Sequence, residues 1–232
     1  MSLSSLPMNP IIVTITGPSS AGKTVLQRAL SENGFEPLVS TTTRPMRAAE
    51  IEGRDYHFVS KAKFLEMLNG GDLIENVEYD GNFYGVSACE AVRAFEQGKP
   101  AVLVAEPHGC EQIHDLCQAR GWTVLRVFVN NPIEVLIDRM LHRFHDDVKA
   151  LDDTTAEGQR MVQAKIDSHG ARIQKILGQE QEEWVKPAYS GQVKYDLIID
   201  RFDTNKNEVV AQVQDLVQQH MLTMGSPRRP KP

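Results

Sequence analysis

The chain has 232 residues, of which 41% are hydrophobic and 24% are charged, a composition typical of a soluble globular protein with a sizeable core. Its formal net charge of −6 argues against a general nucleic-acid binder, because such proteins need a basic face to neutralise phosphates. No secretory signal pattern, membrane-length apolar stretch or CxxC pair is present, so we expect a cytoplasmic protein that binds neither membrane nor nucleic acid.

The first part of the chain predicts a buried strand, a helix and then a small insert. The β-branched run IIVTITG (11–17) is typical of a buried strand, and the segment after Gly22 has the apolar spacing of a helix. A strand over 36–40 is expected next, before a polar, arginine-rich loop. From 56 to 86 we expect short strands and a brief helix (61–69), with turns at NGGD and YDGN.

Strands and helices then alternate. Strands are predicted over 101–106 and 123–129, and helices over 87–97 and 108–119. This alternation indicates an α/β protein whose parallel sheet has right-handed crossovers.

The last part of the chain predicts long helices. The segment 131–144 reads as a helix with Pro132 in its first turn. Thr154 and Glu157 form a capping-box pattern before a long amphipathic segment. A strand over 195–200 and a helix over 205–221 follow. We interpret the apolar stripe of the long segment as packing residues, namely Val162, Ile166, Ile173, Leu177 and Trp184.

The octapeptide GPSSAGKT (17–24) fits the pattern GxxxxGK[ST] between a predicted strand and a predicted helix. There, backbone N–H groups can face phosphate oxygens, and the helix N-terminus adds its positive end. Lys23 would reach the β- and γ-phosphates, and the Thr24 hydroxyl would be a ligand for Mg²⁺. The motif predicts a nucleoside triphosphate site made by Gly17, Ser19, Ser20, Ala21, Gly22, Lys23, Thr24 and Val25.

A second polar segment, VSTTTRPMRAAEIEGRDYHF (39–58), suits an anion with several oxygens. It places four hydroxyl residues (40–43) beside Arg44, Arg47 and Arg54 and ends near Tyr56. Guanidinium forks and hydroxyls are good phosphate ligands, although a solvated loop with incidental charge fits equally well on this segment alone. The segment LIENVEYDGNFYG (73–85) adds the carboxylate of Glu75 and the phenol of Tyr84 to a strand pattern, which favours a ligand site.

Five segments together resemble guanylate kinase, in order and in spacing: GPSSAGKT, VSTTTRPMR, EGRDYHFVS, LIENVEYDGNFYG and NPIEVLIDRMLHR. The resemblance is close over 10–143 and looser beyond. It implies a P-loop three-layer core with a parallel sheet over 10–35, 87–141 and 186–222. It also implies a small α+β monophosphate-binding insert (36–86) and an enlarged helical lid with a long helix (142–185). We expect a disordered tail at 223–232.

The resemblance also implies roles for single residues. The GMP phosphate would be held by Arg44, Arg47, Tyr56 and Tyr84, and the guanine read by Ser40 and Glu75. Glu106 falls where the family usually has an Asp near the base and the metal. The lid arginines would be Arg139, Arg143 and a third, for which Arg172 is the better match and Arg160 the rival. The expected catalytic residues are Lys23, Arg44, Arg139, Arg143 and Arg172.

Four departures from the family pattern lie on the base side and in the lid. Val86 stands where a base-reading Ser or Thr is usual, and the strand end has Val104 and Glu106 in place of two Asp residues. His108 replaces a Gln, and the lid between Arg143 and Arg172 is longer than usual. A missing polar contact relaxes discrimination between bases, so dGMP or a modified purine nucleotide is an alternative acceptor.

The resemblance therefore implies a kinase that uses ATP and Mg²⁺ to phosphorylate GMP or dGMP, as a monomer or homodimer. A kinase for another purine nucleotide, a non-catalytic binding module of the same fold and a sugar-phosphate kinase are the alternatives. The presence of the loop and lid cations favours the enzyme. A metal site on the helix face of Cys110, His114 and Cys117 is a further alternative to simple packing of small hydrophobic cysteines.

Overall fold

The computed structural model describes residues 10–46, 50–79, 81–149, 151–202 and 206–225. Its core is a five-stranded sheet in the order β2-β7-β1-β8-β9 in which every paired strand runs parallel. The strands are β1 (Ile11–Thr16), β2 (Glu36–Pro37), β7 (Ala101–Val104), β8 (Thr123–Val129) and β9 (Leu197–Ile199). The predicted α/β core with a parallel sheet is confirmed.

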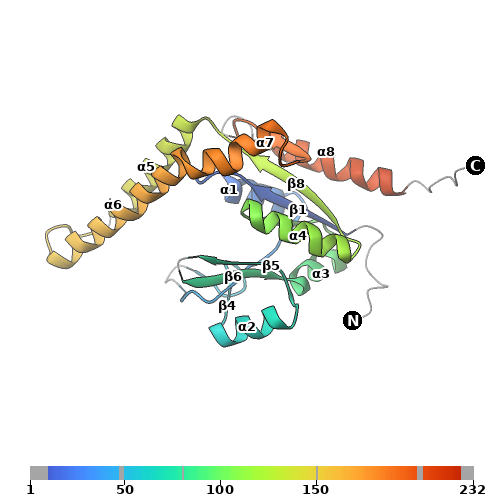
Figure 1. Ribbon diagram of the computed structural model, residues 1–232, viewed down its shortest axis with the longest axis horizontal. Coiled ribbons are helices and arrows are strands. Elements are labelled where there is room, and N and C mark those ends of the chain that lie inside the picture. The colour runs from blue at the N-terminus through green and yellow to red at the C-terminus, as the bar shows by residue number, and fades with distance from the viewer. Residues whose placement is uncertain (1–9, 47–49, 80, 150, 203–205, 226–232) are drawn as a thin grey trace, which may run out of the picture.

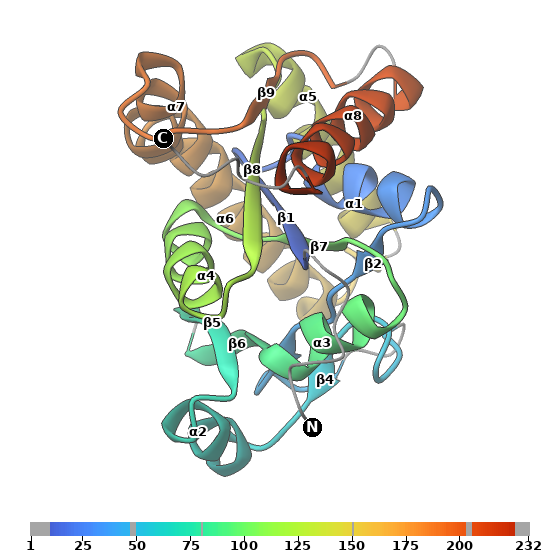
Figure 2. The same cartoon turned by 90° about the vertical axis from the view of Figure 1, so that its right-hand side faces the viewer.

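Helices cover both faces of this sheet, which gives three layers (Figure 2). Ile11, Val13 and Ile15 of β1 pack in one cluster with α1 (Lys23–Ser31), α5 (Ile133–Lys149) and α8 (Lys206–Gly225). Ile12 faces the other cluster, with α3 (Ala88–Glu96) and α4 (Pro107–Ala119). Side chains of a strand alternate between faces, so helices on both sides of the sheet explain why every residue of β1 is buried, Thr14 and Thr16 included.

The insert forms a second, four-stranded sheet in the order β4-β3-β6-β5 that lies below the core in Figure 1. Its elements are β3 (Thr41–Thr42), β4 (His57–Phe58), α2 (Lys61–Asn69), β5 (Leu73–Tyr79) and β6 (Asn82–Ser87). The strand expected over 36–40 is shorter, and its two residues, Glu36 and Pro37, pair with β7. The core sheet therefore includes two residues that the sequence assigned to the insert.

The lid is a hairpin of two helices, α5 and α6 (Ala156–Leu177), that projects away from the core (Figure 1). It ends in a π-helical turn, η2 (Gln181–Val185), and a short helix, α7 (Lys186–Ser190). The helix expected over 131–144 begins one residue after Pro132 and continues to Lys149, so one unbroken helix joins the core to the lid.

One detail of the long helix was predicted wrongly. Its N-cap is Thr155, whose hydroxyl accepts from the Gly158 N–H at 3.0 Å, and not Thr154. The carbonyl of Asp152 packs where a Cβ on Gly158 would lie, 1.6 Å away, and this close turn sets the cap one residue later.

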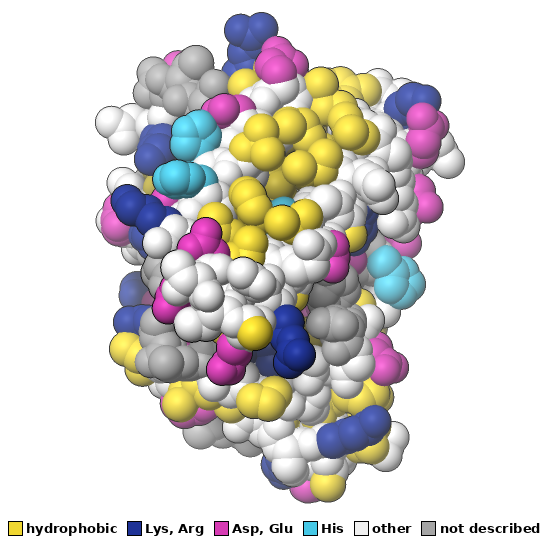
Figure 3. Space-filling model, turned by 90° about the vertical axis from the view of Figure 1, so that its left-hand side faces the viewer, with side chains coloured by type: hydrophobic (Ala, Val, Ile, Leu, Met, Phe, Trp, Pro, Cys, Tyr) yellow, Lys and Arg dark blue, Asp and Glu magenta, His cyan; other side chains and the backbone are white. Residues whose placement is uncertain are grey.

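The apolar stripe of α6 is buried only in part. Ile173 packs against the core, but Ile166 and Leu177 are 46% and 54% exposed because nothing in the described residues covers the outer side of the hairpin. Hydrophobic side chains accordingly gather on the upper part of the face from which the hairpin projects (Figure 3). Among the described residues, no helix has both the length and the apolar character that crossing a bilayer requires.

Candidate functional site

The predicted phosphate loop connects β1 to α1, and two of its glycines are required by packing. Gly17 has φ +144°, and a Cβ there would lie 2.0 Å from the Val129 carbonyl oxygen. Gly22 has φ +99°, and its Cβ would lie 2.6 Å from the Phe202 ring. Any larger residue at either position would push the loop away from the core, so the glycines fix its shape.

Three side chains, one of them from the loop motif itself, donate hydrogen bonds to the carbonyl groups of this loop. The Lys23 ammonium donates to the carbonyls of Gly17 and Pro18 at 2.7 and 2.9 Å. Asn131 Nδ2 donates to the Ala21 carbonyl at 2.8 Å, and Arg139 Nη1 donates to the Ser20 carbonyl at 3.1 Å. Carbonyl oxygens turned toward a phosphate would repel it, so holding them in this way suits an anion-binding loop.

A cavity of about 520 Å³ opens in front of the loop. Lys23 and three arginines share it, which makes the cavity strongly cationic. Burial lowers the pKa of Lys23 to about 8, although Glu180 and Glu106 act against that shift. The lining residues are Ser19, Ser20, Gly22, Lys23, Thr24, Val25, Arg139, Met140, Arg143, Arg172, Phe202 and Lys206.

The third lid arginine in this cavity is Arg172. Arg160 lies twelve residues earlier on α6, about 18 Å away along the helix at 1.5 Å per residue. Arg160 is not among the residues that line this cavity. The geometry therefore favours Arg172 over its rival.

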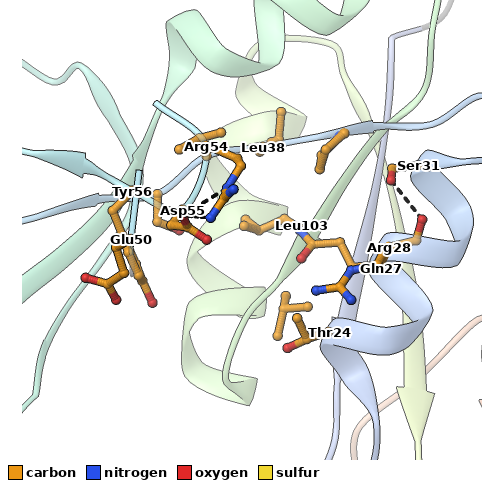
Figure 4. A pocket seen from close by; sticks show the side chains of 14 residues that line it. Thr24, Gln27, Arg28, Ser31, Leu38, Glu50, Arg54, Asp55, Tyr56 and Leu103 are labelled. Carbon is orange, nitrogen blue, oxygen red and sulfur yellow. Dashed lines mark hydrogen bonds and ion pairs between the residues drawn. The ribbon is translucent and has the colours of Figure 1, made fainter. Parts of the chain in front are cut away.

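A second cavity, of about 490 Å³, lies between the insert and α1 (Figure 4). The figure shows Arg54 beside Asp55 on the insert side, and Gln27 and Arg28 on the α1 side. Thr24 lines both cavities, so the two meet at the residue that was predicted to hold Mg²⁺. The lining residues are Thr24, Gln27, Arg28, Ser31, Pro37, Leu38, Val39, Ser40, Glu50, Arg54, Asp55, Tyr56, Leu103 and Val104.

The predicted acceptor-phosphate residues Arg44, Tyr56 and Tyr84 form one cluster. The Arg44 guanidinium carbon lies 5.4 Å from the centre of the Tyr56 ring, and the Tyr56 and Tyr84 rings are 6.0 Å apart. Arg44 Nη2 also pairs with Glu50 Oε1 at 2.6 Å, a contact that raises the pKa of Arg44. Arg47, the fourth predicted member, lies outside the described residues.

Of the predicted base-reading residues, Glu75 lies where β5 meets the start of α4, close to Glu106, whereas Ser40 lines the second cavity. Glu75 is only 8% exposed, and burial together with the nearby Glu106 carboxylate raises its pKa to about 7. A Cβ on Gly109 would lie 3.1 Å from Glu75 Cγ, so a larger residue there would displace the Glu75 side chain by a few tenths of an ångström. Glu106 itself is the N-cap residue of α4.

The side chain of Val86 packs in the hydrophobic core and offers no polar contact. The residue is opposite Glu75 in the β5–β6 register, and its backbone N–H bonds to the Glu75 carboxylate. Its side chain is fully buried in the second hydrophobic cluster with Ile74 and Leu103. The position that would carry a hydroxyl in the family thus contributes packing here.

The residues present fit a magnesium ion shared with a nucleotide. Thr24 supplies a hydroxyl oxygen where the cavities meet, and the charge of Glu106 acts on neighbouring Lys23. The described residues contain no group of three metal-binding side chains. Mg²⁺ usually takes one or two protein oxygens and completes its shell with phosphates and water, so a dedicated cage is not needed.

The two free cysteines on α4 are packing residues of the hydrophobic core. Cys110 and Cys117 are 2% and 0% exposed and pack in the second hydrophobic cluster. Burial raises the pKa of Cys110 to about 11 and of Cys117 to about 12, which keeps both sulfurs as thiols at neutral pH. A metal needs the thiolate, so the alternative of a metal site loses its support.

Sequence reasoning did not identify several residues that shape the site. Asn131 and Phe202 hold the loop from neighbouring elements, and Glu180 bonds to Ser19. An Asn directly before Pro132, which precedes the first residue of α5, was a weak signal for Asn131. The other two contacts join segments far apart in sequence, for which the chain carries no local pattern.

Comparison with known proteins identifies the family of this chain. The family model described as guanylate kinase matches residues 8–220. The chain is 37% identical to the guanylate kinase of Chlamydia felis over 138 residues, which make up 58% of this chain and 65% of that relative. It is 33% identical to the guanylate kinase of Nostoc sp. over 161 residues, 68% of this chain and 79% of that relative.

A solved structure agrees with the architecture. The crystal structure of a guanylate kinase from Anaplasma phagocytophilum aligns with 93% of this chain and 88% of its own, with a TM-score of 0.59 and 22% identity. At this level of identity the likeness supports the fold alone.

Proposed function

The chain belongs to the guanylate kinase family, and from that membership we propose that it transfers the γ-phosphoryl group of ATP to GMP or dGMP, giving ADP and the nucleoside diphosphate. One observation carries the proposal: a cationic cavity at the phosphate loop and a second cavity at the insert share Thr24. Two nucleotides that meet phosphate to phosphate at this residue are the reactants of a monophosphate kinase.

On the donor side, Lys23 and the lid arginines would bind the triphosphate. Phosphoryl transfer places charge on the equatorial oxygens of the moving group, and catalysis consists mainly of positioned cations around it. Arg139, Arg143 and Arg172 come from two helices of the lid hairpin, so closing the hairpin would bring them onto that group together. Mg²⁺, held by Thr24 and the phosphates, would neutralise further charge when bound.

On the acceptor side, Arg44, Tyr56 and Tyr84 would hold the phosphate in line with the donor, joined by Arg47 from outside the described residues. The Glu75 carboxylate would accept the two N–H groups on the guanine edge, next to Ser40. The acceptor phosphate is already an anion near neutral pH, so no general base is required.

A modified purine monophosphate is the second candidate acceptor. The observation that favours it is Val86, whose buried side chain offers no hydrogen bond to the base. A guanine reader that lacks one polar contact discriminates less strongly against related bases.

The test is an ADP-release assay with Mg²⁺–ATP and a panel of GMP, dGMP, AMP, IMP and dTMP. Turnover confined to GMP and dGMP is expected, and the variant Lys23→Ala should abolish it. Equal turnover with AMP or dTMP would contradict the guanylate kinase assignment. ATP binding without turnover on any acceptor would instead point to a non-catalytic binding module.

A further inference from the structure

Glu180 is a buried carboxylate that is bonded to the phosphate loop. Its side chain is 0% exposed. Oε2 accepts from the Ser19 backbone N–H at 2.8 Å, and Oε1 accepts from the Ser19 hydroxyl at 2.7 Å. Both oxygens thus hold a single residue of the loop, 161 positions earlier in the chain.

A carboxylate without solvent is costly, so its retention calls for a reason. The two charge-assisted hydrogen bonds offset part of the loss of hydration. Lys23, four residues after Ser19, supplies opposite charge close by, since Glu180 acts on the titration of that lysine. A buried apolar residue would fill the same space at lower cost, so the bonds to Ser19 are the distinctive contribution of Glu180.

The bonds act where the loop backbone is strained. Ser20 has φ +63°, a left-handed conformation that residues other than glycine seldom adopt. Arg139 holds the Ser20 carbonyl on one side, and Glu180 holds the preceding residue on the other. Fixing both neighbours of the strained peptide keeps the loop in its phosphate-ready shape before the nucleotide arrives.

Glu180 also joins the loop to the lid. Arg172 on the long helix α6 lines the cavity in front of the phosphate loop, and α6 ends at Leu177. Glu180 follows three residues later as the residue that precedes the π-helical turn η2. A movement of the C-terminal end of α6 therefore acts directly on Ser19.

We propose that Glu180 is a positioning residue for the phosphoryl donor, which preforms the phosphate loop through Ser19 and links it to the lid helix that carries Arg172. The inference rests on the proposed function, since it takes Mg²⁺–ATP as the ligand of the loop. It assigns to Glu180 an effect on the donor and none on the acceptor.

The test compares Glu180→Gln, Glu180→Ala and Ser19→Ala with the full-length wild type. Titration calorimetry gives the Kd for Mg²⁺–ATP without acceptor, and kinetics give the KM for each substrate. Glu182→Gln is the matched control, because this exposed carboxylate lies two residues away and pairs with Lys186. Thermal melting establishes that each variant is folded.

We expect both Glu180 variants to raise the Kd and KM for ATP by about tenfold or more, with the KM for GMP within about twofold of wild type. Ser19→Ala should raise them less, because the backbone bond remains. Combining it with Glu180→Gln should add little to Glu180→Gln alone. Glu182→Gln should match wild type.

Wild-type ATP affinity in Glu180→Gln and Ser19→Ala would overturn the inference, as would an equal loss for GMP, which a merely structural role predicts. If Glu180→Ala fails to fold, the other two variants decide. A wild type that binds ATP but fails to phosphorylate GMP would refute the proposed function. A loss of ATP affinity in Glu180→Gln would still support the role of Glu180.

Discussion

The proposed role of Glu75 in reading guanine makes acceptor binding depend on pH. Its pKa of about 7 in the folded protein means that near neutrality half of the free molecules carry a protonated carboxyl group there. A protonated carboxyl cannot accept both N–H groups of guanine. We expect kcat/KM for GMP to fall about tenfold from pH 8 to pH 6, because kcat/KM follows the ionisation of free enzyme and substrate.

Glu75→Gln is the control for this pH dependence. The GMP phosphate itself titrates near pH 6, but it does so equally for both proteins. The ratio of wild-type to variant kcat/KM should therefore isolate Glu75. A ratio that is constant from pH 6 to pH 8 would show that this carboxyl does not control acceptor binding.

The same residue should reduce stability at high pH. Because the folded-state pKa is raised above the ordinary value of 4.5, its stabilising contribution is complete below pH 4.5 and is lost as the pH rises through about 7. The loss amounts to roughly 3 kcal/mol if it is fully expressed. Glu75→Gln should therefore be more stable than wild type at pH 8, measured by urea unfolding.

Glu78→Gln serves as the comparison for stability, because Glu78 lies exposed on the same strand. This variant should keep the wild-type pH dependence. If Glu75→Gln and Glu78→Gln unfold at the same urea concentration at pH 8, ionisation of the buried Glu75 does not lower the free energy of unfolding, and the prediction is wrong.

At the scale of one element, α6 decides which arginine can act. Arg172 lines the cavity in front of the phosphate loop, whereas Arg160 lies near the exposed start of the same helix. We expect Arg172→Ala to lower kcat by about a hundredfold, as for other cations that stabilise a transferring phosphoryl group. Arg160→Ala should stay within about twofold of wild type in the same assay. Equal effects of both substitutions would mean that the hairpin closes in a different arrangement.

Elements with strong periodicity could be predicted from the sequence, whereas their ends could not. The brief helix of the insert, α2, and the strand β8 have the predicted bounds, because apolar spacing and flanking turn residues mark both limits. The N-cap of α6 was displaced by one residue, since Thr154 and Thr155 are equally good caps and only the packing of Gly158 decides between them. The exposure of Ile166 depends on whether another layer covers the hairpin, which is a property of the assembled fold.

At the scale of the whole molecule, the two cavities should accept one continuous ligand. They meet at Thr24, so adenosine and guanosine joined by five phosphates should span both. We expect the Kd of this compound to be lower than that of either nucleotide alone by a factor of about a hundred or more. It should compete with ATP and with GMP. The analogue with two adenosines should bind more weakly, because Glu75 would face the wrong base edge. Inhibition that is non-competitive toward GMP would contradict a shared junction.

The candidate site could be predicted only in its local parts. The phosphate loop and the cluster of Arg44, Tyr56 and Tyr84 come from short motifs, and the structure brings each set together. The bonds from Glu180 to Ser19 depend on how distant segments pack. Such partners are set by the tertiary fold, so no spacing rule along the chain marks them.

The contact between Arg44 and Glu50 has a consequence for how the acceptor enters. The guanidinium already holds one anion at 2.6 Å, so an acceptor phosphate that binds Arg44, as proposed, would replace a carboxylate instead of meeting a bare cation. Binding is then an ion exchange, in which the protein supplies the outgoing ion. Glu50 would return to Arg44 when the product leaves, and this return would oppose rebinding of the product. Glu50 would thus compete with the acceptor phosphate for Arg44. Its effective concentration would be set by the short chain that joins the two residues, which are six positions apart.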